Sequence, residues 1–170
     1  TGARYAAAVS SGTAALHCAA FAAGIERGDE VIVSPLTFAA SGNCALFLGA
    51  VVKFADIRPD TYCIDPKKLK GAISRRTKAI IPVDFSGQPC DMDEIKEIAK
   101  RHNLVVIQDA THSLGATYKK RSVGTLAHMT VFSFHPVKQI TTGEGGMVVT
   151  DDESLLGKVR LFRTHGITDD

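Results

Sequence analysis

Several common protein classes leave marks that this sequence lacks. No apolar run approaches the roughly 20 residues that a membrane-spanning helix needs. The formal net charge is only +2, so the charge balance gives no case for binding nucleic acid or an anionic membrane. None of the four cysteines belongs to a Cys-x-x-Cys pair or lies at metal-ligand spacing from a histidine. We therefore expect a cytoplasmic protein with free thiols, no metal site, and neither nucleic acid nor membrane as a partner.

Two nucleotide-binding motifs are absent as well. No segment has the Gly-x-Gly-x-x-Gly spacing of the dinucleotide fingerprint, and the glycines at positions 143, 145 and 146 are not followed by the Lys-Ser or Lys-Thr of a P-loop. The chain also has no internal repeat or low-complexity segment. These absences argue against a dinucleotide site of that type, a P-loop and a repeat protein.

What the chain does have is enough apolar material for one domain. Its 170 residues are 45% hydrophobic and 22% charged, which is an ordinary composition for a globular protein with one sizeable core. The chain starts at Thr1 without an initiator methionine and stops at Asp170 without a closing element, so both ends look cut. We expect residues 1–170 to be most of one domain of a longer protein.

Short β-branched runs alternate with helical stretches along the chain. Strands are expected at residues 30–34, 50–54, 78–83, 104–108, 129–134 and 146–150, and helices at residues 11–23, 38–48, 91–102 and 152–162 and from Pro66 onward. Strands that are almost entirely apolar are typical of a parallel sheet buried on both faces. The sequence therefore predicts a three-layer α/β fold with a mostly parallel sheet. In such a fold, ligands bind beyond the carboxyl ends of the strands.

Small residues and hydroxyls gather where the first helix begins. The run from Ser10 through Ser11, Gly12 and Thr13 to Leu16 would place exposed N–H groups beside the positive end of the helix dipole, which suits a phosphate group. A plain helix N-cap explains the same residues, because Ser and Thr often precede an Ala-rich helix. Taken alone, the segment favours the N-cap.

An aspartate follows the most apolar strand. Asp109 comes directly after residues 104–108, and a carboxylate at the end of a buried strand is poorly solvated unless it meets a cation or hydrogen-bond donors. A protonated pyridine nitrogen is such a cation, and a carboxylate beside it keeps the ring electron-poor. The alternative, that Asp109 is the N-cap of a helix, is equally compatible with this segment alone.

A serine and then a lysine follow a later strand. The expected strand at residues 129–134 delivers Ser133, and the turn after it presents Lys138. Partial desolvation lowers the pKa of a lysine and prepares it to bond covalently to an aldehyde, although most lysines are solvated surface residues. The three glycines at positions 143, 145 and 146 then allow the backbone to turn tightly beside a ligand.

Each of these three signals is weak alone, but their order along one chain is informative. A phosphate-type helix start, an aspartate at the end of a strand and a serine–lysine turn are the working parts of a pyridoxal 5'-phosphate (PLP) site. We therefore expect PLP as the cofactor and Lys138 as the lysine that holds it.

The same segments resemble the DegT/StrS family of sugar aminotransferases, which belong to PLP fold type I. The resemblance runs from about residue 10 to residue 166, and its most specific pieces are residues 11–16, 109–115, 132–134 with Lys138, and 142–146. It implies a PLP-binding large domain, with the smaller C-terminal domain of the family outside this chain. It also implies a homodimer in which the partner subunit supplies further site residues.

The resemblance implies how the cofactor would be bound. Thr13 and Ala14 would bind the PLP phosphate through hydroxyl and backbone groups, and Ser133 would add a second hydroxyl. Phe38 would stack on the pyridine ring. His112 would contact the cofactor near its ring oxygen, where many members of the family have glutamine.

The resemblance also implies the chemistry. Asp109 would pair with the ring nitrogen, and Lys138 would hold the cofactor and then move a proton between it and the substrate carbon. The amino donor would be L-glutamate and the acceptor a 4-keto nucleotide-sugar. Within the family, residues 134–138 (Phe-His-Pro-Val-Lys) are most similar to the UDP-4-amino-4,6-dideoxy-N-acetyl-β-L-altrosamine transaminases of pseudaminic acid biosynthesis.

Two other functions stay open at this point. Related PLP-dependent sugar dehydratases have histidine in place of the lysine, and the presence of Lys138 argues against that reaction; His135 lies three residues too early. A binding domain that had lost catalysis should lack Lys138 or Asp109, and both are present. The isolated chain is nevertheless expected to be inactive, because a dimer and the second domain are needed.

Overall fold

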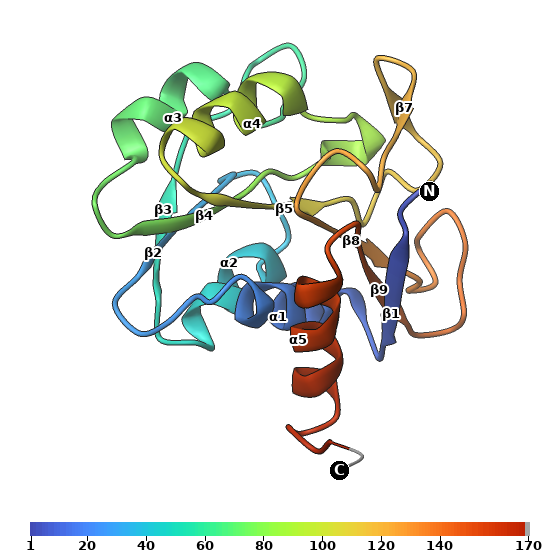
Figure 1. The fold of residues 1–170 in the computed structure, drawn as a ribbon. Coiled ribbons are helices and arrows are strands. Elements are labelled where there is room, and N and C mark those ends of the chain that lie inside the picture. Colours follow the sequence, from blue (N-terminus) through green and yellow to red (C-terminus); the bar gives the residue numbers. More distant parts are fainter. Residues whose placement is uncertain (169–170) are drawn as a thin grey trace.

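The fold is built on one seven-stranded sheet (Figure 1). The structure is a computed structural model, and it describes residues 1–168. The strands are β1 (Tyr5–Val9), β2 (Glu30–Val33), β3 (Val51–Phe54), β4 (Thr77–Ile81), β5 (Val105–Asp109), β8 (Met129–Ser133) and β9 (Gly146–Thr150), with β6 (Thr117–Tyr118) and β7 (Arg121–Ser122) in a separate hairpin. The helices are α1 (Gly12–Ala22), α2 (Ala40–Leu46), α3 (Pro66–Ala72), α4 (Met92–Arg101) and α5 (Glu153–Arg163), with a 3-10 turn at Phe85–Gly87.

The sheet is mostly parallel, as the sequence predicts. Its strands lie in the order β1-β9-β8-β5-β4-β2-β3. β2 pairs in parallel with β3 and β4, and β5 pairs in parallel with β4 and β8. β9 is antiparallel to both of its neighbours, β1 and β8, so β1 runs in the same direction as β8. The carboxyl ends of β1, β5 and β8 therefore lie at the same edge of the sheet.

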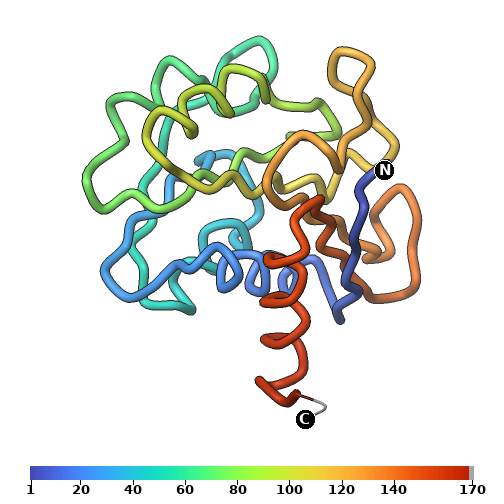
Figure 2. The backbone as a smooth tube through the Cα atoms, in the orientation of Figure 1, coloured from blue at the N-terminus to red at the C-terminus, as the bar shows by residue number. Residues whose placement is uncertain are grey.

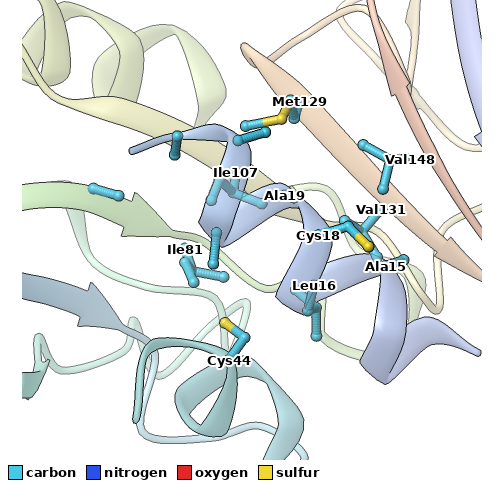
Figure 3. Packing of buried hydrophobic residues seen from close by; sticks show 14 of the residues in the cluster. Ala15, Leu16, Cys18, Ala19, Cys44, Ile81, Ile107, Met129, Val131 and Val148 are labelled. Carbon is cyan, nitrogen blue, oxygen red and sulfur yellow. The ribbon is translucent and has the colours of Figure 1, made fainter. Parts of the chain in front are cut away.

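Helices cover both faces of the sheet and complete three layers (Figure 1). α3 and α4 lie on one face, whereas α1, α2 and α5 lie on the other. Strand side chains alternate between the faces: Val31 and Val33 of β2 belong to the core beside α1 and α2, and Ile32 belongs to the core beside α3 and α4. Figure 3 shows the first core, where the small side chains of Ala15 and Ala19 let α1 approach the strands closely.

Local signals in the sequence explain where the helices begin. Ser11 is the N-cap of α1 and accepts a hydrogen bond from the Ala14 amide at 3.1 Å. Asp65 caps α3 in the same way, with Pro66 at the start of the helix. Asp152 caps α5. Each cap pairs an amide that the first turn of a helix leaves without a partner.

The structure differs from the predicted elements in three places. β1 has no counterpart among the predicted strands, because its central alanines have little β propensity and its pairing with β9 holds it in place. α2 begins at Ala40 and not at residue 38, which leaves Phe38 outside the helix. The hairpin of β6 and β7, with residues 119–120 as its turn, is also absent from the predicted elements, and Lys119 and Arg121 form ion pairs there with Asp93.

The path of the backbone runs from one edge of the sheet to a projecting C-terminal helix. Figure 2 follows the chain from the N-terminal strand at one edge of the sheet to α5, whose end projects away from the sheet. Within residues 1–168, no helix is both long enough and apolar enough to cross a membrane. The loops that position functional groups are those that follow β1, β2, β5 and β8, at the edge where the carboxyl ends of the strands lie.

Candidate active site

One cavity lies where the carboxyl ends of these strands meet the first turns of α1 and α2. It encloses about 420 Å³. The lining residues are Ser11, Gly12, Thr13, Leu16, Phe38, Ala40, Ser41, Asp109, Thr111, Ser133, His135, Val137, Lys138 and Glu144. The cavity thus brings together residues from four segments that are far apart in the sequence, at the edge where α/β proteins bind their ligands.

The start of α1 forms a polar end of the cavity. Ser11, Gly12 and Thr13 line it beside Ser133, so three hydroxyls and the positive end of the α1 dipole are gathered there. The fit is tight, because a Cβ at Gly12 would lie 2.9 Å from the Ser133 Cβ. A helix start with this many donors suits a phosphate group.

Ala14 differs from the other residues expected to bind phosphate. It does not line the cavity, and its amide donates to the Ser11 hydroxyl at 3.1 Å. The N-cap that the sequence favoured for this segment therefore exists, and it uses the amide that the resemblance assigned to phosphate. Thr13, one residue earlier, does line the cavity, so the segment can both cap the helix and face a ligand.

Asp109 is the buried anion of the cavity. The residue is 4% exposed; its Oδ2 accepts a hydrogen bond from the Ser41 hydroxyl at 2.6 Å, and its Oδ1 accepts one from the Thr111 amide at 3.2 Å. In the part of the chain that the structure describes, no lysine or arginine forms an ion pair with it. A buried carboxylate without a cationic partner is costly, so a cationic group of a ligand fits this position.

The helix-cap alternative for Asp109 is wrong. The chain leaves β5 through turns, and the next regular element after Asp109 is the short strand β6. The carboxylate still receives a local hydrogen bond from the Thr111 amide, but this bond closes a turn of the loop. The other carboxylate oxygen accepts a hydrogen bond from the hydroxyl of Ser41, which belongs to a different segment of the chain.

Lys138 lies in the turn after β8. The turn closes through a hydrogen bond from the Lys138 amide to the His135 carbonyl at 2.9 Å, and the side chain lines the same cavity as Asp109. Partial burial lowers the pKa of the Lys138 ammonium, while the negative charge of Asp109 raises it by a smaller amount. The amine therefore loses its proton more readily than that of an ordinary lysine, which suits bonding to a carbonyl carbon.

Phe38 provides an aromatic wall. Its side chain is 77% exposed, it lines the cavity, and it lies in the loop between β2 and α2. A large aromatic side chain contributes to stability mainly when it is buried. One that is exposed beside a cavity is instead available to stack on a flat ligand.

His112 lies beside the cavity and does not line it. The side chain is half-buried, and burial and then the positive charge of Lys138 lower its pKa, whereas Asp109 raises it. Its backbone carbonyl accepts a hydrogen bond from the Gln139 side chain. This contact ties the loop after β5 to the turn that carries Lys138.

The sequence assigned no role to two polar residues that line the cavity, Ser41 and Glu144. Glu144 lies in the glycine-rich turn, with its Oε1 3.8 Å from the His135 Nε2. Ser41 follows Phe38 by three residues, about one helical turn, and this spacing could have drawn attention to it. Its contact with Asp109 spans 68 positions of the chain and could be recognised only from the fold.

Known proteins match nearly all of this chain. The sequence model of one protein family, described as the DegT/DnrJ/EryC1/StrS aminotransferase family, matches residues 1–170 of this chain. The spore coat polysaccharide biosynthesis protein SpsC of Bacillus subtilis is 50% identical over 167 residues, which are 98% of this chain and 43% of the relative. The GDP-perosamine synthase of Caulobacter vibrioides is 49% identical over 166 residues (98% and 45%). The UDP-4-amino-4,6-dideoxy-N-acetyl-β-L-altrosamine transaminase of Campylobacter jejuni is 47% identical over 169 residues (98% and 44%).

The chain thus spans less than half the length of these relatives, and solved structures show the same partial coverage. The aminotransferase from Psychrobacter cryohalolentis matches with a TM-score of 0.95 at 44% identity, over 98% of this chain and 42% of that one. NtdA from Bacillus subtilis, solved with bound cofactor PMP, matches with a TM-score of 0.89 at 41% identity, over 94% and 36%. These matches confirm the predicted α/β fold.

Proposed function

This chain belongs to the DegT/DnrJ/EryC1/StrS aminotransferase family, and from that membership we propose that the protein containing it is a PLP-dependent aminotransferase. The reaction moves an amino group from an amino acid to a keto group of a nucleotide-linked sugar. The observation that carries this proposal is the single cavity lined by both Lys138 and Asp109. An amine with a lowered pKa and a buried anion without a cationic side-chain partner are what PLP chemistry requires of a protein.

The residues present fit each part of the cofactor. The hydroxyls of Thr13 and Ser133, beside the start of α1, would hold the phosphate. Asp109 would face the ring nitrogen, where its charge needs a cation, and Phe38 would cover the face of the ring. Ala14 would contribute by ordering the phosphate-binding turn, since its amide is paired with the N-cap hydroxyl.

Lys138 would act on protons and as the attachment point. Bound PLP supplies an aldehyde that condenses with amines and a ring that stabilises negative charge on the adjoining carbon. Lys138 would hold the cofactor through its Nζ until an amino donor takes its place. The released Nζ would then accept a proton from the donor carbon and return it later in the cycle. Its lowered pKa helps because the amine must be unprotonated when it accepts that proton.

The acceptor that we propose is a 4-keto nucleotide-sugar, and the donor is L-glutamate. Relatives whose names give different products, the GDP-perosamine synthase and the altrosamine transaminase, match at 49% and 47% identity, so overall identity does not choose between their sugars. The narrower proposal, a UDP-linked sugar on the route to pseudaminic acid, depends on residues 134–138 and on the altrosamine transaminase among the relatives. Val137 and His135 of that segment line the cavity.

We also propose that residues 1–170 form the PLP-binding large domain of a cytoplasmic homodimer, with a smaller domain elsewhere in the protein. The coverage of 43–45% of each relative supports the first part. Apolar side chains that line the cavity support the homodimer and the smaller domain: Phe38 and Val137 are each 77% exposed. Exposed apolar side chains that gather at one site mark a surface that another chain or domain covers.

The test uses the full-length protein with PLP. We expect an absorbance band of protein-bound cofactor and, with L-glutamate and a UDP-linked 4-keto sugar, a product whose mass shows an amine in place of the carbonyl oxygen. Lys138→Ala should abolish both the covalent attachment and the product. Lys120→Ala, which removes an exposed lysine of the β6–β7 turn, is the matched control and should behave as the wild type.

Two results would contradict the proposal. Retention of the band and of product by Lys138→Ala would mean that another amine holds the cofactor. A product that has lost water and gained no amine would instead support the sugar dehydratase alternative.

A further inference from the structure

The carboxylate of Asp109 is held by two hydroxyls in series. The Ser41 Oγ lies 2.6 Å from the Asp109 Oδ2, and the Thr37 Oγ1 lies 2.7 Å from the Ser41 Oγ. Ser41 is completely buried, so water does not compete for its hydroxyl. The short distance to Asp109 is typical of a hydrogen bond to a charged acceptor.

The direction of this chain follows from the donors available. An ionised carboxylate can only accept hydrogen bonds, and a serine hydroxyl has a single proton to give. Ser41 must therefore donate to Asp109. The Thr37 hydroxyl must then donate to Ser41, because the Ser41 proton is already used. Hydrogen bonds aligned in this way polarise one another and strengthen the terminal bond to the charged group.

The two oxygens of Asp109 are anchored from different parts of the fold. Oδ2 is held by Ser41 in α2, and Oδ1 is held by the Thr111 amide in the loop after β5. A carboxylate gripped at both oxygens cannot rotate about its last side-chain bond. Ser41 is itself fixed: its amide donates to the Phe38 carbonyl at 3.2 Å, and its carbonyl accepts from the Cys44 thiol at 3.3 Å.

One short segment thus reaches two parts of the cavity. Thr37 and Ser41 fix the orientation of Asp109, and Phe38 between them supplies the exposed aromatic wall. If a planar ligand lies against Phe38, the position of Asp109 at the edge of that ligand depends on Thr37 and Ser41, which belong to the same five residues, 37–41. The face and the edge of the ligand are therefore aligned through a single piece of backbone.

We propose that Ser41 is a positioning residue of the active site and that Thr37 supports it. The pair orients the Asp109 carboxylate toward the ring nitrogen of PLP, so this inference rests on the proposed function. Ser41 does not act on the substrate. Its contribution is to keep the carboxylate pointed at the position where the ring cation binds, before the cofactor arrives.

The test compares three variants of the full-length protein. Ser41→Ala removes the donor to Asp109, Ser41→Thr keeps a hydroxyl, and Thr37→Val removes the outer hydroxyl at nearly constant shape. Ser34→Ala is the matched control, because Ser34 is equally buried before α2 and, among residues 1–168, its hydroxyl donates only to the Leu36 carbonyl, at 3.4 Å. Four quantities are measured: the dissociation constant of PLP, the absorbance maximum of bound cofactor, kcat and KM for the donor half-reaction, and the crystal structure of the cofactor-free protein.

Loss of a hydrogen bond to a charged group changes an equilibrium by about tenfold or more. We therefore expect Ser41→Ala to raise the PLP dissociation constant about tenfold, to shift the absorbance maximum, and to lower kcat with little change in KM. The cofactor-free Ser41→Ala structure should show a rotated Asp109 carboxylate. Ser41→Thr should restore affinity and spectrum, Thr37→Val should produce a smaller effect in the same direction, and Ser34→Ala should match the wild type.

The inference is overturned if Ser41→Ala binds PLP with the affinity and spectrum of the wild type, or if Ser34→Ala loses affinity to the same extent. The supporting role of Thr37 is overturned if Thr37→Val matches the wild type in PLP affinity and in spectrum. These outcomes differ from failure of the proposed function, in which the wild-type protein itself would bind no PLP.

Discussion

At the scale of single residues, two opposing influences act on the proton of Lys138. Partial burial lowers the pKa of its ammonium, and the negative charge of Asp109 raises it by a smaller amount. Asp109→Asn removes the negative charge and leaves the burial. The pKa of Lys138 should therefore fall further in this variant, and the amine should become reactive at a lower pH than in the wild type.

Competitive acetylation of the cofactor-free protein across a pH series, followed by mass spectrometry, measures the pH at which each lysine amine becomes reactive. The midpoint for Lys138 should lie below the ordinary lysine value in the wild type and move to lower pH in Asp109→Asn. Lys120 serves as the internal reference within the same sample. A midpoint that moved to higher pH in Asp109→Asn would show that the two side chains do not interact as the structure indicates.

The residues of the site differ in how far the sequence could predict them. Asp109 and Ser133 end apolar strands and Lys138 follows one of them, and a parallel sheet brings the carboxyl ends of such strands to one edge. Their common cavity was therefore foreseeable. Ser41 could not be identified in this way, because its role depends on a hydrogen bond across the fold. For Ala14, two acceptors are candidates for one amide, a ligand phosphate and the Ser11 hydroxyl, and in the structure the Ala14 amide donates to the Ser11 hydroxyl.

At the scale of secondary-structure elements, a second buried carboxylate links β4 to β5. Asp84 follows β4, is fully buried, and accepts hydrogen bonds from the Cys90 amide at 3.0 Å, the Gln108 side chain at 2.8 Å and the Ser113 hydroxyl at 2.6 Å. Burial raises its pKa from 3.8 to about 6, and the hydrogen bonds only partly oppose this. Its amide also donates to the Asp109 carbonyl at 3.0 Å.

This raised pKa makes stability depend on pH in a defined direction. Below pH 3.8 the Asp84 carboxyl is protonated in both the folded and the unfolded chain, so the stability that the protonated carboxyl allows is fully present. Between pH 3.8 and about 6 only the unfolded chain loses the proton, so stability falls as pH rises. The difference between the two pKa values corresponds to roughly 3 kcal/mol. Asp84→Asn should remove this decrease of the unfolding free energy with rising pH.

Urea unfolding of the cofactor-free full-length protein between pH 4 and pH 7 measures the effect. The difference in unfolding free energy between the wild type and Asp84→Asn should change by roughly 3 kcal/mol across that range. Ser113→Ala is a second variant: it removes a donor that lowers the pKa of Asp84, so the slope should extend to higher pH. A constant difference between wild type and Asp84→Asn would contradict the assignment.

The start of a helix could be predicted from the sequence where a side chain caps it. α1, α3 and α5 begin at residues whose side chains cap them, Ser11, Asp65 and Asp152, and these helices were expected at nearly the observed positions. α2 has no side-chain cap, so its start depends on tertiary contacts and was misplaced by two residues. β1 was missed for a similar reason, since only its pairing with β9 distinguishes its alanines from a helix.

At the scale of the whole molecule, two hydrophobic clusters are buried, one on each face of the sheet, but part of the apolar surface is not covered. At the opposite edge of the sheet from β1, three apolar side chains are exposed on the side of the sheet that α2 covers: Leu46 (54%) at the end of α2, Phe47 (57%) directly after it, and Phe54 (60%) in β3. We refer to these three residues as the α2–β3 surface. β3 is also an edge strand of the sheet, and an open apolar edge favours association with other chains.

Residues 1–170 produced alone should therefore fold and self-associate. We expect the helix and strand content of the structure by circular dichroism, together with binding of an apolar dye and elution as a larger species in size-exclusion chromatography. Leu46→Lys with Phe54→Lys should reduce both dye binding and self-association, because two charges on the α2–β3 surface oppose its burial. Ser122→Lys adds a charge on the separate β6–β7 hairpin and should leave both unchanged. A monomeric wild-type chain that binds no dye would show that this surface needs no covering, and the proposal that a further domain or a second subunit covers apolar faces of this chain would lose its support.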